Sequence, residues 1–279
     1  MFNWEELENY CLNCRRCKLS GGRTHVVVGD GNKEADIMFI GEGPGKQEDL
    51  QGLPFVGPAG QLFDKMLASI GLDRSKVYIC NVVKCRPPYN RDPEEDEKTA
   101  CLPLLRTQVA LVKPKIIVCL GRISGQVVMR SDFRITREHG VWEERKGYWL
   151  SATYHPAALL RDPAKKRESW EDLKKLKAKI EELGIFAAAD GLGADAAVEA
   201  RETAEFQSAD DFQVQQRDLV DDDAAAAEDL PWASASPAED FSEYPDVDFS
   251  LDADWQEPVR TVESDEIPGS EDDLNLLGF

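Results

Sequence analysis

Three polar residues at the ends of apolar runs have the types needed for bond-breaking chemistry. Glu42 follows the run 36–41, Asn81 lies near the end of a second run, and His155 closes a third. Together an acid, an amide and a histidine can orient a water, read the hydrogen-bonding edge of a ligand and stabilise developing charge. Each also has an ordinary explanation, as a loop charge, a turn residue or a cap, so their position in the fold decides between the two.

The glycine-rich stretch 39–49, "FIGEGPGKQED", has the glycines and the lysine of a phosphate-binding loop but not their spacing. Only three residues separate Gly41 from Gly45, and neither Ser nor Thr follows Lys46, whereas a phosphate loop needs four residues and a hydroxyl. The carboxylate of Glu42 would also repel a phosphate. We therefore expect this loop to present Glu42 and free backbone N–H groups to a different ligand.

The elements that must position these residues follow from alternating apolar runs and helical patterns. This alternation is typical of a parallel α/β sheet. It predicts a three-layer α/β/α sandwich with a central, mainly parallel four-stranded sheet, built from residues 36–41, 77–83, 115–121 and 148–155. Ligands of such sheets bind beyond the carboxyl ends of the strands, so the acid, the amide and the histidine should converge on one crevice.

Three helices complete the expected core. The first covers 57–72 and is stopped by Gly71. The second covers 91–112, with Asp92 as the N-cap and Pro93 in the first turn, a typical helix start. The last follows Ser169 and ends before residue 184.

Charge divides the chain into two parts. Residues 1–183 hold 30 Lys and Arg against 26 Asp and Glu, a net charge of +4, whereas 184–279 hold 3 against 27, a net charge of −24. The acidic part has no sustained hydrophobic period, so we predict a folded domain over 1–183 and a disordered acidic tail over 184–279. No membrane span or signal peptide is visible, and we expect a cytoplasmic protein without a membrane partner.

Four motifs of the chain resemble those of a known family. In order, they are "GEGPG", "LPFVGPAGQLF", "NVVKCRPP" and "YHPAALLRDP". The chain resembles the iron–sulfur uracil-DNA glycosylases, family 4 of that superfamily, from about Trp4 to Leu183. The acidic tail lies outside the resemblance. Relatives that trap uracil DNA covalently carry a histidine-containing insertion after the second strand, and residues 85–97 here contain no histidine.

Seven cysteines in a reducing compartment favour metal-binding or structural thiols over disulfides. By number, four thiolates suit a [4Fe-4S] cluster and a zinc ion equally well; the family pattern favours the cluster. The resemblance assigns the ligands Cys14, Cys17, Cys85 and Cys101. Cys11 could compete as a ligand, while Cys80 and Cys119 lie inside apolar runs and are expected to be buried structural thiols.

The resemblance also implies the roles of the site residues. Glu42 would orient the attacking water and stabilise the cationic sugar, the backbone around Gly41 and Gly43 would hold the base, and His155 would donate a hydrogen bond to uracil O2. The substrate-reading residues would be Phe55, which stacks on the flipped base, Asn81, which pairs with O4 and N3–H, and Glu48, which fills the space of a thymine methyl.

The segment after His155 is expected to open the DNA. Either Leu159 or Leu160 would act as an apolar wedge, and Arg161 and Lys165, with the basic residues that follow, would lie near phosphates. A solvated helix start explains the lysines almost as well.

These observations predict a monomeric, monofunctional uracil-DNA glycosylase of base excision repair that leaves an abasic site in single- or double-stranded DNA. The acidic tail would either solubilise the chain, compete with DNA for the folded domain, or bind a repair or replication protein. Two alternatives remain: a catalytically silent sensor of uracil in DNA and a nucleotide-binding enzyme that uses the glycine turn.

Overall fold

Four apolar runs of the sequence form the centre of one sheet in the computed structural model, which describes residues 3–186. The sheet order is β1-β3-β2-β4-β6-β5, and the inner four strands are parallel. These inner strands are β2 (Ile37–Gly41), β3 (Tyr78–Asn81), β4 (Ile116–Leu120) and β6 (Tyr148–Thr153). The predicted α/β class and the parallel centre are confirmed.

The predicted number of strands was wrong, because the sheet has six strands and not four. The additional strands lie at its two edges and run antiparallel to their neighbours: β1 (Asp30–Gly31) pairs with β3, and β5 (Glu143–Arg145) pairs with β6. Both are very short and polar, so they lack the apolar run from which the inner strands are recognised.

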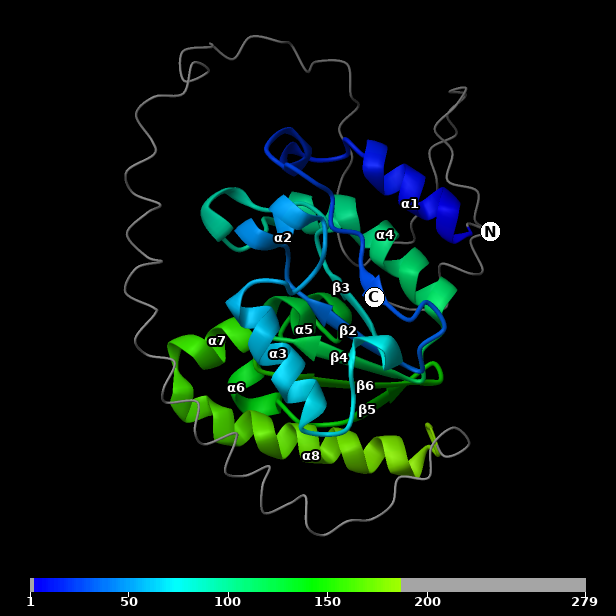
Figure 1. The fold of residues 1–279 in the computed structure, drawn as a ribbon, viewed down its shortest axis with the longest axis vertical. Helices are drawn as coiled ribbons and strands as arrows, with labels where there is room; N and C mark the ends of the chain where they lie inside the picture. The colour runs from blue at the N-terminus through cyan, green and yellow to red at the C-terminus, as the bar shows by residue number, and fades with distance from the viewer. Residues whose placement is uncertain (1–2, 187–279) are drawn as a thin grey trace. The chain divides into compact units, whose positions relative to one another are not determined.

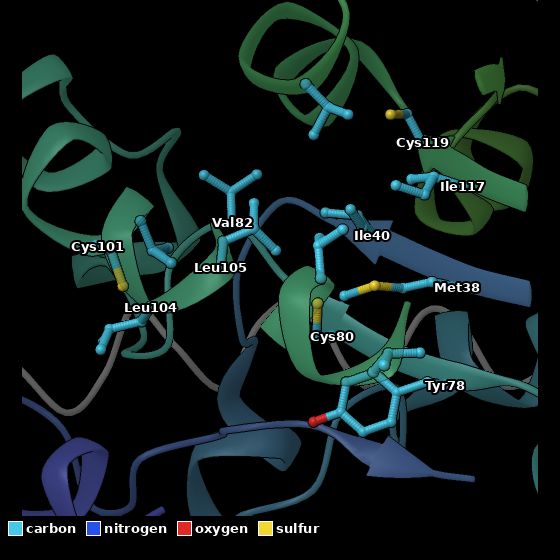
Figure 2. Packing of buried hydrophobic residues seen from close by; sticks show 14 of the residues in the cluster. Met38, Ile40, Tyr78, Cys80, Val82, Cys101, Leu104, Leu105, Ile117 and Cys119 are labelled. Atoms are coloured by element: carbon cyan, nitrogen blue, oxygen red, sulfur yellow. The ribbon is translucent and has the colours of Figure 1, made fainter. Parts of the chain in front are cut away.

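Helices cover both faces of the sheet, as a three-layer sandwich requires (Figure 1). Strand residues alternate between the faces. On one face, Figure 2 shows side chains of β2, β3 and β4 packed beside α4 (Glu95–Val112), among them Ile40, Cys80 and Cys119. Leu7 and Cys11 of α1 (Trp4–Asn13) join the same core.

The opposite face packs against α3 (Pro58–Ala68) and α8 (Lys166–Glu182). Phe39 of β2 meets Phe63 of α3 with ring centroids 5.1 Å apart. Leu173, Leu176 and Ile180 form the buried stripe of α8. The remaining elements are shorter: α2 (Lys46–Gln51), α5 (Arg122–Val128), α6 (Ile135–Glu138), α7 (Pro156–Arg161) and four 3₁₀ turns, Lys18–Gly21, Arg74–Lys76, Pro88–Asn90 and Pro163–Lys165.

The second helix starts later than its sequence indicated. Its N-cap is Glu94 and not Asp92, because the Glu97 carboxylate accepts the Glu94 N–H at 2.7 Å and closes a capping box there. Arg91 also holds both Glu97 carboxylate oxygens, at 2.6 and 2.8 Å. Asp92 is therefore left outside the helix, where it is available for other contacts.

The C-terminal ends of two predicted helices agree with the sequence more closely. Gly71 has φ +77° just beyond α3, and Gly184 has φ +63° just beyond α8. The domain boundary at residue 183 stays a prediction, and almost all of the acidic tail, from residue 187, lies outside the described residues. Within 3–186, no helix is both long and apolar enough to cross a membrane.

Candidate active site

The strand order places the expected site residues at one edge of the sheet. β2 has β3 on one side and β4 on the other, so the direction of winding reverses there, and ligands of doubly wound sheets bind at such a reversal. Gly41 and Asn81 are directly paired in the register of β2 and β3. Glu42 follows β2, and His155 follows β6 by two residues.

Gly41 makes room for the first group of side chains. A Cβ atom at this position would lie 2.3 Å from Asn81 Oδ1 and 2.7 Å from Phe55 Cζ. Both distances are far below van der Waals contact, so only glycine allows the amide and the aromatic ring to meet here. Gly41, Phe55 and Asn81, which are distant in sequence, thus pack against one another.

Asn81 brings an acceptor without a hydrogen-bond partner to this group of residues. The residue is 2% exposed, and its Oδ1 has no hydrogen-bond partner among the described residues. A buried acceptor left without a donor costs about 1–3 kcal/mol. Asn81 is therefore suited to a ligand that offers an N–H group to this oxygen.

Phe55 is held in an unusual backbone conformation. Its φ is +55°, a region that a bulky residue occupies only when its surroundings require it. The Arg74 guanidinium donates to the carbonyls of Pro54, at 2.9 Å, and of Phe55. Gly60 has no Cβ, which would otherwise lie 1.8 Å from the Phe55 carbonyl oxygen. These contacts hold the backbone of Phe55, and with it the ring, against Gly41 and Asn81.

His155 packs on Phe55 and has a defined tautomer. The two ring centroids are 5.6 Å apart, with 28° between the planes. The Ala157 N–H donates to His155 Nδ1 at 3.1 Å, so the proton of the neutral ring sits on Nε2. Burial, with a smaller effect of Arg161, lowers the pKa of His155 to about 4. At neutral pH, His155 is therefore an uncharged hydrogen-bond donor.

Glu42 lies beside a second carboxyl group that the sequence did not assign to the site. Burial, followed by the neighbouring Asp92, raises the pKa of Glu42 to about 7, while Arg122 and Arg161 act in the opposite direction. Asp92 in turn forms an ion pair with Arg122. The Glu42 carboxyl group consequently changes its ionisation state near neutral pH.

Asp92 and Arg122 were both missed in the sequence. Asp92 was assigned to a helix cap, and only the three-dimensional start of α4 frees it. Arg122 had a usable signal, because it follows the third inner strand by two residues, where ligand-binding residues of α/β sheets are found.

Glu48 joins two loops of the site. One carboxylate oxygen accepts the N–H groups of Val56 and Gly57, both at 2.9 Å, and the other accepts the N–H of Gly45 at 3.1 Å. These bonds connect the glycine turn to the segment that carries Phe55. The visible role of Glu48 is to hold these loops together, and its role against the thymine methyl stays a prediction.

The two leucines after His155 differ in exposure. Leu159 is fully buried, so the structure does not support it as a wedge, whereas Leu160 is half-buried. Arg161 is exposed and close enough to influence Glu42 and His155. Lys165 pairs with Asp162 at 3.0 Å, so it would have to exchange this partner for a phosphate.

Five cysteines form a second centre, between α1, the following 3₁₀ turn and α4. Its hollow is lined by Arg16, Arg23, Lys84 and the thiols of Cys11, Cys14, Cys17, Cys85 and Cys101. The Arg23 guanidinium donates to Cys85 Sγ at 3.2 Å. Several thiols with cations around them are the donor set of an anionic metal–thiolate group, so the residues present fit such a group. Cys80 and Cys119 are fully buried elsewhere in the core, as predicted.

The arrangement of these thiols differs from that around a single ion. Within the described residues, no three Cys, His, Asp or Glu side chains are gathered as the ligands of one metal ion. Four sulfurs around one zinc would each lie about 2.3 Å from the same point. The cysteines share a hollow without sharing such a point.

Comparison with known proteins gives the class of this fold and site. Residues 28–174 match the family model of the uracil DNA glycosylase superfamily, and the chain belongs to that superfamily. Among its relatives, the type-4 uracil-DNA glycosylase of Sulfurisphaera tokodaii is 47% identical over 186 residues, which cover 63% of this chain and 84% of the relative. That of Archaeoglobus fulgidus is 45% identical over 184 residues, covering 63% and 92%.

The similarity to other types is weaker. A type-5 uracil-DNA glycosylase of Pyrobaculum aerophilum is 28% identical over 189 residues, covering 56% of this chain and 83% of the relative. The chain therefore belongs with the type-4 enzymes, and the resemblance seen in its four motifs is confirmed.

Proposed function

We propose that this protein hydrolyses the N-glycosidic bond between uracil and deoxyribose in DNA, leaving an abasic site in the first step of base excision repair. The observation that carries this proposal is the unpartnered Oδ1 of Asn81, buried beside Phe55. Uracil N3–H is a donor that would satisfy this oxygen. Cytosine has no hydrogen on N3 and would leave this oxygen unpaired, so Asn81 would favour uracil.

His155 and Glu42 would act on opposite sides of the bond that breaks. The base leaves with negative charge, which the Nε2–H of neutral His155 can stabilise by donating to uracil O2. One such preorganised donor contributes about 10²–10³ in rate. The sugar becomes cationic, and the ionised form of Glu42 can stabilise it and orient the attacking water.

The remaining site residues would bind rather than react. Phe55 would stack on the flipped base, and the backbone of Gly41 and Gly43 would hold its edge. Glu48 would keep the two loops together and reject a thymine methyl. Leu160 would enter the space vacated in the duplex, with Arg161 and Lys165 near phosphates.

The cysteine centre would hold a [4Fe-4S] cluster through Cys14, Cys17, Cys85 and Cys101. The family resemblance, together with five cysteines around one hollow, supports a cluster over a single zinc ion. Such a cluster would be structural, joining the N-terminal segment to the loop after β3. Cys11 lines the same hollow, so an experiment must test whether it is a ligand in place of one of these four cysteines.

The other partners and the location are also proposals. DNA containing uracil, single- or double-stranded, is the substrate, and we propose a cytoplasmic monomer. The acidic tail, net −24, is tethered to a domain of net +4 and would compete with DNA in a salt-dependent manner. Its C-terminal end would bind a repair or replication protein.

Incubation with oligonucleotides that contain one uracil, thymine or cytosine tests the proposed activity. We expect alkali-labile abasic sites at uracil only, in single-turnover conditions. Asn81→Ala should abolish most of this signal, whereas Val141→Ala, at an exposed position away from the site, should retain it. Binding of uracil DNA without abasic sites would replace the enzyme with the sensor.

A further inference from the structure

One aromatic side chain of the described residues stands in solvent. Tyr89 is 92% exposed, and its φ is +55°. The next residue, Asn90, also has a positive φ, +52°. Two successive non-glycine residues in the left-handed region are costly, and they persist where the surroundings fix them.

The surroundings of Tyr89 do fix it. Its neighbour Pro88 has a restricted φ. Arg86 Nε donates to Asn90 Oδ1 at 2.8 Å, across the turn that carries the ring. Arg91 then anchors the end of this turn to the buried Glu97 through two hydrogen bonds of 2.6 and 2.8 Å. The loop therefore presents an exposed ring on a constrained backbone, which lowers the entropy lost on binding.

The same loop borders the candidate active site. A Cβ on Gly43 would lie 3.7 Å from Pro87 Cδ, so the loop rests on the glycine turn that carries Glu42. At its other end, Asp92 contacts the Glu42 carboxyl group. Tyr89 lies between these two contacts in the chain, at the rim of the site.

We propose that Tyr89 stacks on a DNA base next to the nucleotide that is flipped into the pocket. This inference rests on the proposed function. Base flipping leaves neighbouring bases without a stacking partner, and an aromatic side chain stacks on any base. The isolated ring, with the Arg86 guanidinium in the same turn, suits a base flanked by phosphates, whereas a protein partner would require a wider apolar surface.

Two substitutions separate the ring from the backbone that carries it. Tyr89→Gly removes the ring and also relieves the left-handed conformation, so its melting temperature should be equal to or higher than that of the parent. Tyr89→Phe retains the ring and removes only the hydroxyl. Val141→Ala is the matched control at another exposed apolar position.

The measurement is binding to DNA that contains 2′-fluoro-deoxyuridine, an uncleavable uracil nucleotide, with 2-aminopurine on either side of it. We expect Tyr89→Gly to weaken affinity about tenfold, in the range of one base–aromatic stack, and to raise the fluorescence of the 2-aminopurine that the ring covers. Tyr89→Phe and Val141→Ala should stay within about twofold of the parent.

Two results would overturn the proposal: unchanged affinity and fluorescence in Tyr89→Gly, or an equal loss in Tyr89→Phe, which would assign the effect to the hydroxyl. A separate assay of uracil release by the parent protein tests the proposed function. If no uracil is released but Tyr89→Gly still changes the fluorescence, the stacking survives and the enzymatic function fails.

Discussion

The rings of Phe55 and His155 lie 5.6 Å apart, inclined by 28°, although the two residues are a hundred positions apart in the chain. Phe55 is fixed through its backbone carbonyl, and His155 is fixed through Nδ1. The pair thus connects the surface that would receive the base with the donor that would stabilise it as it leaves.

Phe55→Leu should lower single-turnover uracil release about 10- to 100-fold, because it removes the stacking surface and one wall of His155. Its matched control is Phe39→Leu, which alters another ring packed against Phe63 without reaching His155. This control should lose stability while keeping most of its rate below its melting temperature. Equal rate losses in both variants would assign the effect of Phe55 to core packing alone.

The carboxyl pair of Glu42 and Asp92 predicts the pH dependence of the rate. Since the pKa of Glu42 is raised to about 7, and its ionised form is the active one, single-turnover release should increase through pH 7. Asp92→Asn removes a neighbouring negative charge and should move the midpoint to lower pH. Arg122→Gln removes a cation that favours the ionised form and should move it to higher pH.

These opposite shifts are measured from rates between pH 5 and 9 on one uracil substrate. Lys115→Gln, a change to a lysine paired with Asp36, is the control and should leave the midpoint unchanged. Shifts of the same sign in Asp92→Asn and Arg122→Gln would contradict the electrostatic explanation.

Glu42→Gln should lose activity and gain stability at high pH. The folded pKa of Glu42 lies above its ordinary value, so the folded state binds more protons and the protein loses stability as pH rises through about 4.5 to 7. The variant lacks this loss. We expect its free energy of unfolding to exceed that of the parent by about 1–3 kcal/mol at pH 8, allowing about 1.4 kcal/mol per pKa unit and a discount for partial exposure. The advantage should disappear at pH 4, while uracil release is nearly abolished at both.

Asn81→Asp should weaken uracil release by at least about 100-fold, because a carboxylate cannot donate to O4, and should allow slow release of cytosine when the new carboxyl is protonated. The two bases are quantified after incubation with matched oligonucleotides. Unchanged preference for uracil would show that Asn81 does not read the base, whatever the effect on rate.

The cysteine centre predicts a brown protein when it is purified anaerobically, with broad absorption near about 400 nm. Cys101→Ser should lose the colour, the bound iron and part of the free energy of unfolding. Cys11→Ser is the matched control: it should keep the iron if Cys14 and Cys17 are the ligands from the N-terminal segment. A colourless parent protein that binds one zinc ion would exclude the cluster.

The sequence by itself determined the inner strands, the approximate extent of the helices and the sheet edge at which Glu42, Asn81 and His155 lie. Apolar runs show buried strands directly, and the geometry of parallel strands brings their carboxyl ends together. The four sequence motifs indicated the family to which the chain belongs. The edge strands β1 and β5 could not be predicted, because two or three polar residues become a strand only when a neighbour supplies the hydrogen bonds.

Only the tertiary structure decided the burial and the charged neighbours of the site residues. The local sequence predicts Asp92 as a helix cap. In the structure, contacts of Glu97 with Glu94 and Arg91 place the start of the helix two residues later, which leaves Asp92 free to contact Glu42. Likewise, Leu159 and Leu160 are adjacent residues of the same type. The packing of α7 buries Leu159 and leaves Leu160 partly exposed. Burial and electrostatics depend on neighbours that are distant in the chain, so local patterns contain the residue types but not their environments.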